Sequence, residues 1–120
     1  MRIEENGPET CKVARSGGFV LVRVPVRVLD DIDYSPLTFR YTIGGFVGRE
    51  SKWPSSGKNE IALHFRIPLE LFRDRERFTV EVLRPEEQSR PQVLWSARRE
   101  VRWQSGTPGL EPLEEPAPTF

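Results

Sequence analysis

The chain has 120 residues, a formal net charge of zero and one cysteine, Cys11. This length fits one domain, the zero net charge speaks against strong electrostatic capture of nucleic acid, and a lone cysteine excludes an internal disulfide and a cysteine-based zinc site. No apolar run reaches membrane-spanning length and the N-terminus has no apolar signal-peptide region. We therefore expect a cytoplasmic protein, or an extracytoplasmic one if the chain is a piece of a longer protein.

The first part of the chain predicts one weak strand and one strong strand. Residues 1–15 are polar, with a short edge strand expected at Thr10–Ala14, and Ser16–Gly18 forms a turn. Phe19–Leu29 carries a valine at every second position, which is typical of a half-buried strand with its valines inward. Pro25, at the centre of this strand, lacks a backbone donor, so we expect an open side or a break there.

The middle of the chain predicts two more strands of the same kind. Leu37–Ile43 alternates apolar and polar side chains, Gly44-Gly45 ends it, and Phe46-Val47 forms a short following strand. We expect a long loop at Gly48–Lys58. Asn59–Ile67 is the next strand, with its apolar residues at alternate positions.

The last part predicts two strands and a tail. Pro68–Arg77 is expected to hold one turn of helix, since proline favours the first helical position. Phe78–Leu83 and Gln92–Trp103 read as strands, with Arg99 on the apolar parity of the second, so a bulge or the end of the core should lie near it. Ser105–Phe120 is rich in proline and glutamate and is predicted to be a disordered, linker-like tail.

Strands of this length without an amphipathic helix predict an all-β fold, an antiparallel two-sheet β-sandwich. The expected organisation is an N-terminal segment at 1–15, the sandwich at 16–104 and the tail at 105–120. The strand, Ile-Pro, leucine-rich turn and Phe78-Thr79-Val80-Glu81-Val82 order resembles the E–F corner of immunoglobulin-like and fibronectin type III domains. Those families have a tyrosine where Phe78 stands. A C2-like or other jelly-roll sandwich is the structural alternative.

Residues that carry catalytic or metal-binding chemistry are sparse. His64 is the only histidine, it lies mid-strand on the outward parity, and no hydrolase, metalloprotease or phosphate-loop motif occurs. We therefore expect no enzymatic activity and no cofactor. Asp30, Asp31 and Asp33 are weak candidates for calcium ligation, and the simpler interpretation is a turn in which the carboxylates cap backbone N–H groups.

Trp53 is the candidate for a binding residue in a loop. The run Phe39–Ile43, then Trp53, then Gly57-Lys58-Asn59 resembles starch-binding carbohydrate modules, and the resemblance implies sugar binding by Trp53 and neighbouring aromatics. The upstream tryptophan of that family is missing. The simpler interpretation, which we favour, is that Trp53 folds back over one end of the sandwich.

Arg23, Arg27, His64 and Arg66 are predicted to form one basic sheet face if their two strands are neighbours, whereas Arg98 and Arg102 belong to the other sheet. This face lacks outward aromatic side chains for base stacking, so nucleic acid is not the expected partner. Leu21 and Leu83 are outward by parity and are candidate interface positions.

Together these patterns predict a non-catalytic interaction module that makes protein–protein contacts within a larger protein or assembly. Glycan binding through Trp53 is the alternative.

Overall fold

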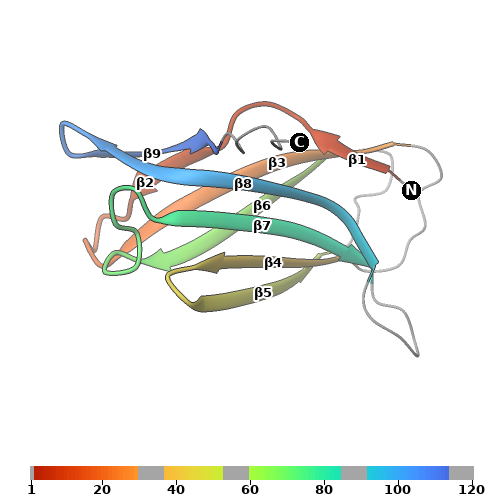
Figure 1. The fold of residues 1–120 in the computed structure, drawn as a ribbon, viewed down its shortest axis with the longest axis horizontal. Coiled ribbons are helices and arrows are strands. Elements are labelled where there is room, and N and C mark those ends of the chain that lie inside the picture. The colour runs from red at the N-terminus through yellow and green to blue at the C-terminus, as the bar shows by residue number, and fades with distance from the viewer. Residues whose placement is uncertain (1, 30–36, 53–59, 85–91, 114–120) are drawn as a thin grey trace, which may run out of the picture.

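The described part of the chain consists of strands and their connections; a computed structural model places residues 2–29, 37–52, 60–84 and 92–113 (Figure 1). The strands are β1 (Arg2–Glu5), β2 (Thr10–Val13), β3 (Phe19–Leu29), β4 (Leu37–Ile43), β5 (Phe46–Lys52), β6 (Glu60–Pro68), β7 (Arg77–Arg84), β8 (Gln92–Gln104) and β9 (Thr107–Pro112). They form two antiparallel sheets, which confirms the predicted sandwich. Within these ranges, no helix is long and apolar enough to cross a membrane.

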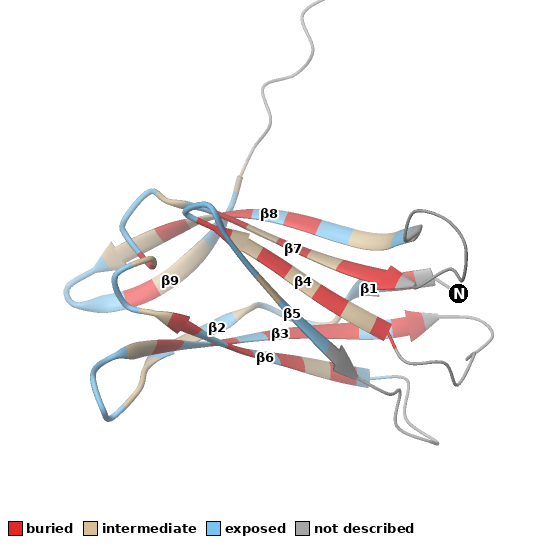
Figure 2. Ribbon diagram, turned by 90° about the horizontal axis from the view of Figure 1, so that it is seen from below, coloured by how far each residue is buried: buried red, intermediate tan, exposed pale blue. Residues whose placement is uncertain are grey.

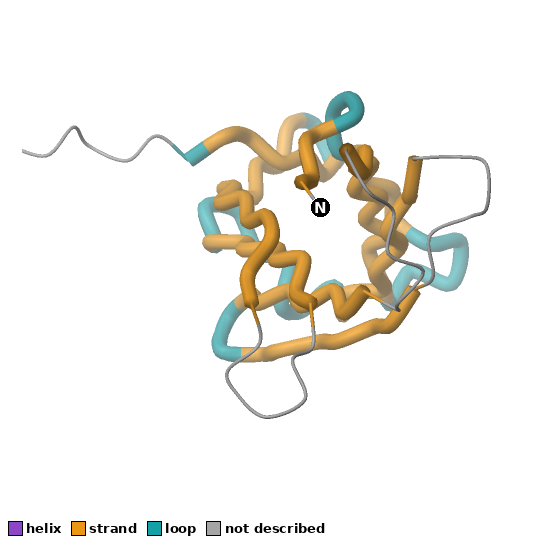
Figure 3. The backbone as a smooth tube through the Cα atoms, turned by 90° about the vertical axis from the view of Figure 1, so that its right-hand side faces the viewer, coloured by secondary structure: helices purple, strands orange, loops and turns teal. Residues whose placement is uncertain are grey.

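The strands are divided unequally between the two sheets. In sheet A, β3 pairs with β6 on one side and with both β1 and β2 on the other. Sheet B has the order β5-β4-β7-β8-β9. Viewed end-on, the strands surround a common centre (Figure 3). The predicted short strand at the N-terminus is confirmed as β2, and β1 is an additional strand that hydrophobic alternation did not indicate.

Pro25 marks the place where the neighbour of β3 changes from β2 to β1. Asn6 donates its backbone N–H to the carbonyl of Pro25 at 3.1 Å. In an antiparallel ladder the N–H and C=O of one residue point to the same side. The missing donor of Pro25 therefore faces the connection between the end of β1 and the start of β2, and no hydrogen bond to β6 is lost. The expected break thus lies between β1 and β2, the two strands that pair with this side of β3, while β3 itself continues without interruption.

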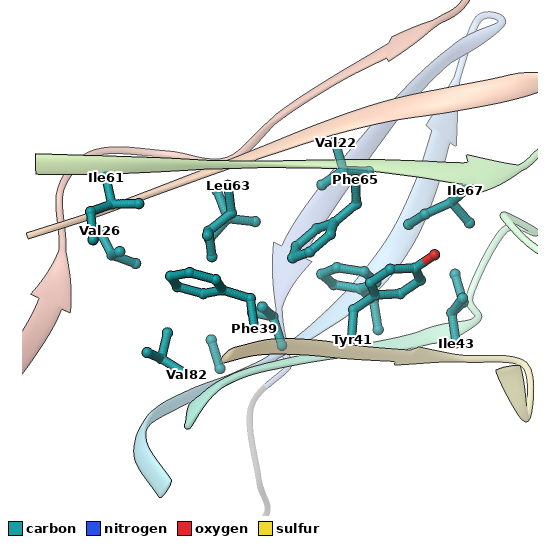
Figure 4. Close-up of a cluster of buried hydrophobic side chains, with 14 of the residues drawn as sticks. Val22, Val26, Phe39, Tyr41, Ile43, Ile61, Leu63, Phe65, Ile67 and Val82 are labelled. Carbon is teal, nitrogen blue, oxygen red and sulfur yellow. The ribbon is translucent and has the colours of Figure 1, made fainter. Parts of the chain in front are cut away.

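The core lies between the sheets and follows the predicted alternation (Figure 2, Figure 4). The inward valines of β3 are almost fully buried, as are Phe39 on β4 and Phe65 on β6. Tyr41, Phe65 and Phe78 form an aromatic cluster, with 4.7 Å between the ring centroids of Tyr41 and Phe65. Because these rings come from three strands in both sheets, their packing fixes how the sheets face each other.

The β4–β5 hairpin corrects the predicted loop after Gly48. Gly44 and Gly45 have φ values of 54° and 80°, the conformation of a two-residue hairpin turn that favours glycine. β5 then pairs with β4 as far as Lys52. Along β5, a Cβ at Gly48 would overlap the ring of Tyr41. The polar sequence of β5 fits an edge strand, because its described side chains remain at least partly exposed.

The β6–β7 connection forms hydrogen-bonded turns, and the predicted turn of helix is wrong. Leu71 donates to the carbonyl of Pro68 at 3.0 Å, but no helix follows. Instead the segment is held against β8: Arg75 N–H donates to the Val101 carbonyl at 2.6 Å, and the indole N–H of Trp103 donates to the Phe72 carbonyl at 2.7 Å. Bonds to a neighbouring strand replace those that a helix would make internally.

The predicted disordered tail is also wrong where the structure describes it. Ser105 and Gly106 have positive φ values and reverse the chain, so that β9 pairs with β8 along Thr107–Pro112. Leu110 packs against the core. A preformed neighbour supplies hydrogen bonds and apolar contacts that composition alone does not reveal. Residues 114–120 lie outside the described part.

Two residues of the β7–β8 pair are buried against the expectation from sequence. Leu83 lies opposite Thr38 on the outward parity, as predicted, but its side chain is only 3% exposed, so it is not an open interface position. Arg99 stays in register opposite Phe78 and is buried. Its guanidinium is satisfied by ion pairs to the N-terminal segment, so no bulge is needed at Arg99 itself.

Candidate interaction surface on the outer face of sheet A

The outer face of sheet A brings together three of the four basic residues predicted for it. The antiparallel register places His64 directly opposite Arg23, and Arg66 opposite Leu21. On the other side of β3, Lys12 lies opposite Leu21. Alternation puts all five on the surface away from the core. We call this set, Lys12, Leu21, Arg23, His64 and Arg66, the basic patch.

The basic patch has an exposed apolar centre. Leu21 is 40% exposed, so part of its apolar side chain is open to contact at the centre of the patch. Its exposure was predicted from parity and is confirmed. Lys12 and Arg66 flank Leu21 on the two neighbouring strands, and Arg23 follows it on β3. A bound partner could cover this leucine and exclude water from it, while the surrounding cations contact polar groups of the partner.

The cations of the basic patch are not neutralised by neighbours. Within the described ranges, Lys12, Arg23 and Arg66 form no ion pair with a carboxylate. The guanidinium of Arg66 lies 4.6 Å from the centroid of the Phe19 ring, in a cation–π contact that holds it without neutralising its charge. On sheet B the situation differs, since Arg40 pairs with Glu81 at 2.8 Å.

Arg27 shares the face but does not belong to the patch. Its guanidinium lies 3.8 Å from Glu4 and 3.7 Å from Glu60, and it donates to the side-chain oxygen of Asn6 at 2.9 Å. Exposed pairs of this kind contribute little stability, but they cancel the local positive charge. The predicted basic face therefore ends at Arg23, and the row formed by Glu4, Arg27 and Glu60 carries one more negative than positive charge.

A shallow, mostly apolar hollow adjoins the basic patch at the end of β3. It is lined by Gly17, Gly18, Phe19, Pro68, Leu69 and Glu70. The backbone N–H of Leu69 donates to the carbonyl of Gly18 at 3.1 Å and closes one side. Leu69 is itself 37% exposed. The hollow continues the apolar surface of Leu21, because Phe19 and Leu21 are two residues apart on the same face.

His64 and Cys11 lie on opposite faces of sheet A. Cys11 pairs with Val22, an inward residue, whereas His64 pairs with the outward Arg23. Burial, and to a smaller extent the negative charge of Glu9, raises the pKa of the Cys11 thiol to about 11. The two side chains are thus separated by the sheet and form no nucleophile–base pair, and the thiol is held in its unreactive protonated form.

The remaining predicted site residues are not brought to this surface. Trp53, Asp30, Asp31 and Asp33 lie outside the described residues, and so the sugar-binding and calcium alternatives stay predictions. The aromatics near Trp53 in the starch-binding resemblance, Phe39 and Tyr41, are buried in the core. Among the residues that the structure places, no cluster of histidine, cysteine or carboxylate side chains could hold a metal ion.

Sequence reasoning missed Lys12 and the hollow at Phe19. The short strand predicted at Thr10–Ala14 already implied that Lys12 points outward. Only the β2–β3 register, however, shows that Lys12 lies beside Leu21. The hollow depends on the turn after Pro68, which no local pattern specifies. No family model, curated protein or solved structure matches this chain.

Proposed function

We propose that the protein is a non-catalytic interaction module that makes protein–protein contacts within a larger protein or assembly through the outer face of sheet A. The observation that carries this proposal is the basic patch itself: three cations without carboxylate partners in the described ranges surround a leucine that is 40% exposed. Arginine and aromatic side chains beside an apolar centre are typical of the residues that dominate binding energy at protein interfaces.

The cost of the patch to the isolated chain supports the same conclusion. Leu21, at 40% exposed, lacks only part of the hydrophobic stabilisation of about 2 kcal/mol that full burial of a leucine gives. Clustered positive charges repel each other, and sheet B shows that this sandwich can neutralise an arginine with a neighbouring glutamate, as at Arg40 and Glu81. A surface that keeps both unfavourable features fits a role in binding better than a role in folding.

We further propose that the sandwich is of the immunoglobulin-like type. The strand order supports this: β3 and β6 pair in one sheet while β4, β7 and β8 are consecutive in the other, which corresponds to the B–E and C–F–G pairings of that fold. β5 extends the second sheet beyond β4, as an added strand does in variable-type domains. Phe78, at the start of β7, is fully buried at the predicted corner.

Site-specific photo-crosslinking tests the proposed function. A photoreactive amino acid replaces Leu21, and in a matched control it replaces Val47, an exposed apolar residue on the outer face of β5 in sheet B. In extracts of the source cells, position 21 should give a discrete protein adduct that position 47 does not give. Equal adducts from both positions, or none from position 21, would contradict the proposal.

A further inference from the structure

We propose that the basic patch binds an extended acidic peptide segment that carries one large apolar side chain. This inference rests on the proposed function and adds the chemistry of the partner. The acidic side chains would lie over Lys12, Arg23 and Arg66, and the apolar side chain would enter the hollow beside Phe19.

The size of the surface favours a segment over a folded domain. From Phe19 to Arg23, β3 advances about 13 Å, at roughly 3.3 Å per residue, and the three strands are about 10 Å across at nearly 5 Å each. A stable interface between two folded proteins takes about 800 Å² from each partner, several times this footprint. An extended segment of about five residues matches the length of the patch.

The arrangement of charges selects an acidic partner. Lys12 and Arg66 lie on either side of Leu21, and Arg23 follows in the next outward position of β3. Alternate side chains of an extended segment are about 7 Å apart, which is also the spacing of successive outward residues on β3. Carboxylates at alternate positions can therefore each face a cation of the patch. The guanidinium of Arg66, held over the ring of Phe19, still carries N–H donors that can reach a carboxylate.

The other end of the face limits where this segment can lie. Glu4 and Glu60 flank Arg27 and leave that row with excess negative charge. Acidic side chains are repelled there and are attracted toward Arg23 and toward the two cations beside Leu21. The apolar side chain is then at the end nearest the hollow, where Phe19 and Leu69 can bury it. The charge gradient along β3 thus gives the bound segment one preferred position.

A peptide fits this surface better than a single-stranded nucleic acid does. The aromatic ring in the patch region, Phe19, has the guanidinium of Arg66 over it, so that face of the ring is not open to a stacked base. Glu70 lines the hollow, and Glu4 and Glu60 interrupt the face at its opposite end. A phosphate backbone would meet these carboxylates at both ends of the cationic row.

Fluorescence anisotropy with defined probes tests this inference on the full chain. The main probe is a labelled glutamate peptide with one central leucine. The comparison probes replace the leucine by glycine, or the glutamates by lysines, and a short single-stranded oligothymidine is the nucleic-acid probe. We expect the glutamate–leucine peptide to bind best, and added salt to weaken its binding because the attraction is electrostatic.

Charge-reversed variants connect the binding to the patch. Arg23→Glu and, independently, Lys12→Glu should each weaken the glutamate–leucine peptide about fivefold or more, since each changes an attraction into a repulsion of similar size. Arg49→Glu on β5 of sheet B is the matched control and should leave the affinity unchanged. Leu69→Ser should reduce the preference for leucine over glycine in the peptide. Circular dichroism establishes that each variant keeps its strand content.

Each remaining outcome overturns the inference. Equal weakening by Arg49→Glu would mean that only net charge matters, and no binding of the acidic peptide would remove the proposed partner. Oligothymidine that binds more tightly, and is weakened by Arg23→Glu, would assign the patch to nucleic acid instead. If photo-crosslinking at position 21 still captures a protein while the acidic peptide fails, the proposed function stands and the acidic partner is wrong.

Discussion

The ion pairs of Arg99 offer a direct test of how the N-terminal segment is held to the sandwich. Arg99, on β8, donates from Nε to Glu9 at 2.7 Å and from a terminal nitrogen to Glu5, and its other terminal nitrogen donates to the Arg98 carbonyl at 2.9 Å. The side chains of Arg99 and Glu9 are only 11% and 12% exposed, whereas that of Glu5 is 50% exposed. Arg99 therefore joins sheet B to the end of β1 and to the connection between β1 and β2.

We expect Arg99→Met to reduce the free energy of unfolding by about 3 to 5 kcal/mol, because it leaves the buried carboxylate of Glu9 without a partner. That loss would be a large part of the stability of a domain of this size, which is typically about 5 to 15 kcal/mol. Glu5→Gln should cost less than about 1 kcal/mol, since water can solvate the half-exposed group. Urea denaturation followed by tryptophan fluorescence measures both values.

The double variant Arg99→Met with Glu9→Gln separates the ion pair from simple packing. Removing both charges together avoids the unpaired carboxylate, so the double variant should recover about 2 kcal/mol relative to the sum of the two single variants. The reasoning would be refuted if the two losses simply added, or if Arg99→Met cost less than about 1 kcal/mol. Either result would mean that the connection between β1 and β2 is held to the sandwich by apolar contacts and not by the ion pair of Arg99.

Further substitutions at three sites, with one control substitution, test local features of the fold. Gly48→Ala should lower the free energy of unfolding by about 1 to 3 kcal/mol because the added methyl overlaps Tyr41, whereas Gly18→Ala, which meets open space, should be close to neutral; equal effects would contradict this. Cys11, with its pKa raised to about 11 from 9.0, should react with a disulfide reagent at pH 8 about a hundredfold more slowly than a free thiol. Because the unfolded chain loses that thiol proton first, stability should fall as the pH rises from 9 through 11, and Cys11→Ala should remove this part of the fall in urea titrations. Trp103→Phe deletes the 2.7 Å bond from the indole to the β6–β7 connection and should cost about 1 kcal/mol, measured by thermal unfolding; no change would show that this bond is replaced by water.

The strands that were predicted well are those whose own sequence alternates. The inward valines of Phe19–Leu29 and the apolar residues of Leu37–Ile43 have a period of two, which depends only on the local pleat. These strands contain the core, and so the two-sheet fold followed from them. Even the consequence of Pro25 was predictable, because a missing donor must face a gap in the ladder.

The strands that were missed depend on a neighbour far away in sequence. β9 has proline at both Pro108 and Pro112 and reads as a linker, yet β8 pairs with it from Arg99 to Gln104. β1 is four residues long and is stabilised by β3 and by the ion pair from Glu5 to Arg99. No pattern within either segment contains this information, because the stabilising contacts lie on the partner.

The candidate surface was predictable only in part for the same reason. Arg23, His64 and Arg66 were expected to share a face on the condition that their strands are neighbours, and the β3–β6 register meets this condition. The loss of Arg27 from the basic set required knowing that Glu4 and Glu60 lie beside it. Charge on a sheet face is decided by cross-strand neighbours, whereas sequence parity decides only which face a residue occupies.

Pro25 connects the fold to the proposed binding surface. Because the neighbour of β3 breaks opposite this residue, two different segments cover the two halves of β3. β1 brings Glu4 to Arg27 and neutralises it, while β2 brings Lys12 to Leu21 and adds positive charge. One continuous strand across Pro25 would need a backbone donor that proline lacks. The division of the face into a neutralised half and a basic half therefore follows from the same break that the fold requires, and the charge gradient that positions an acidic segment is built into the architecture of sheet A.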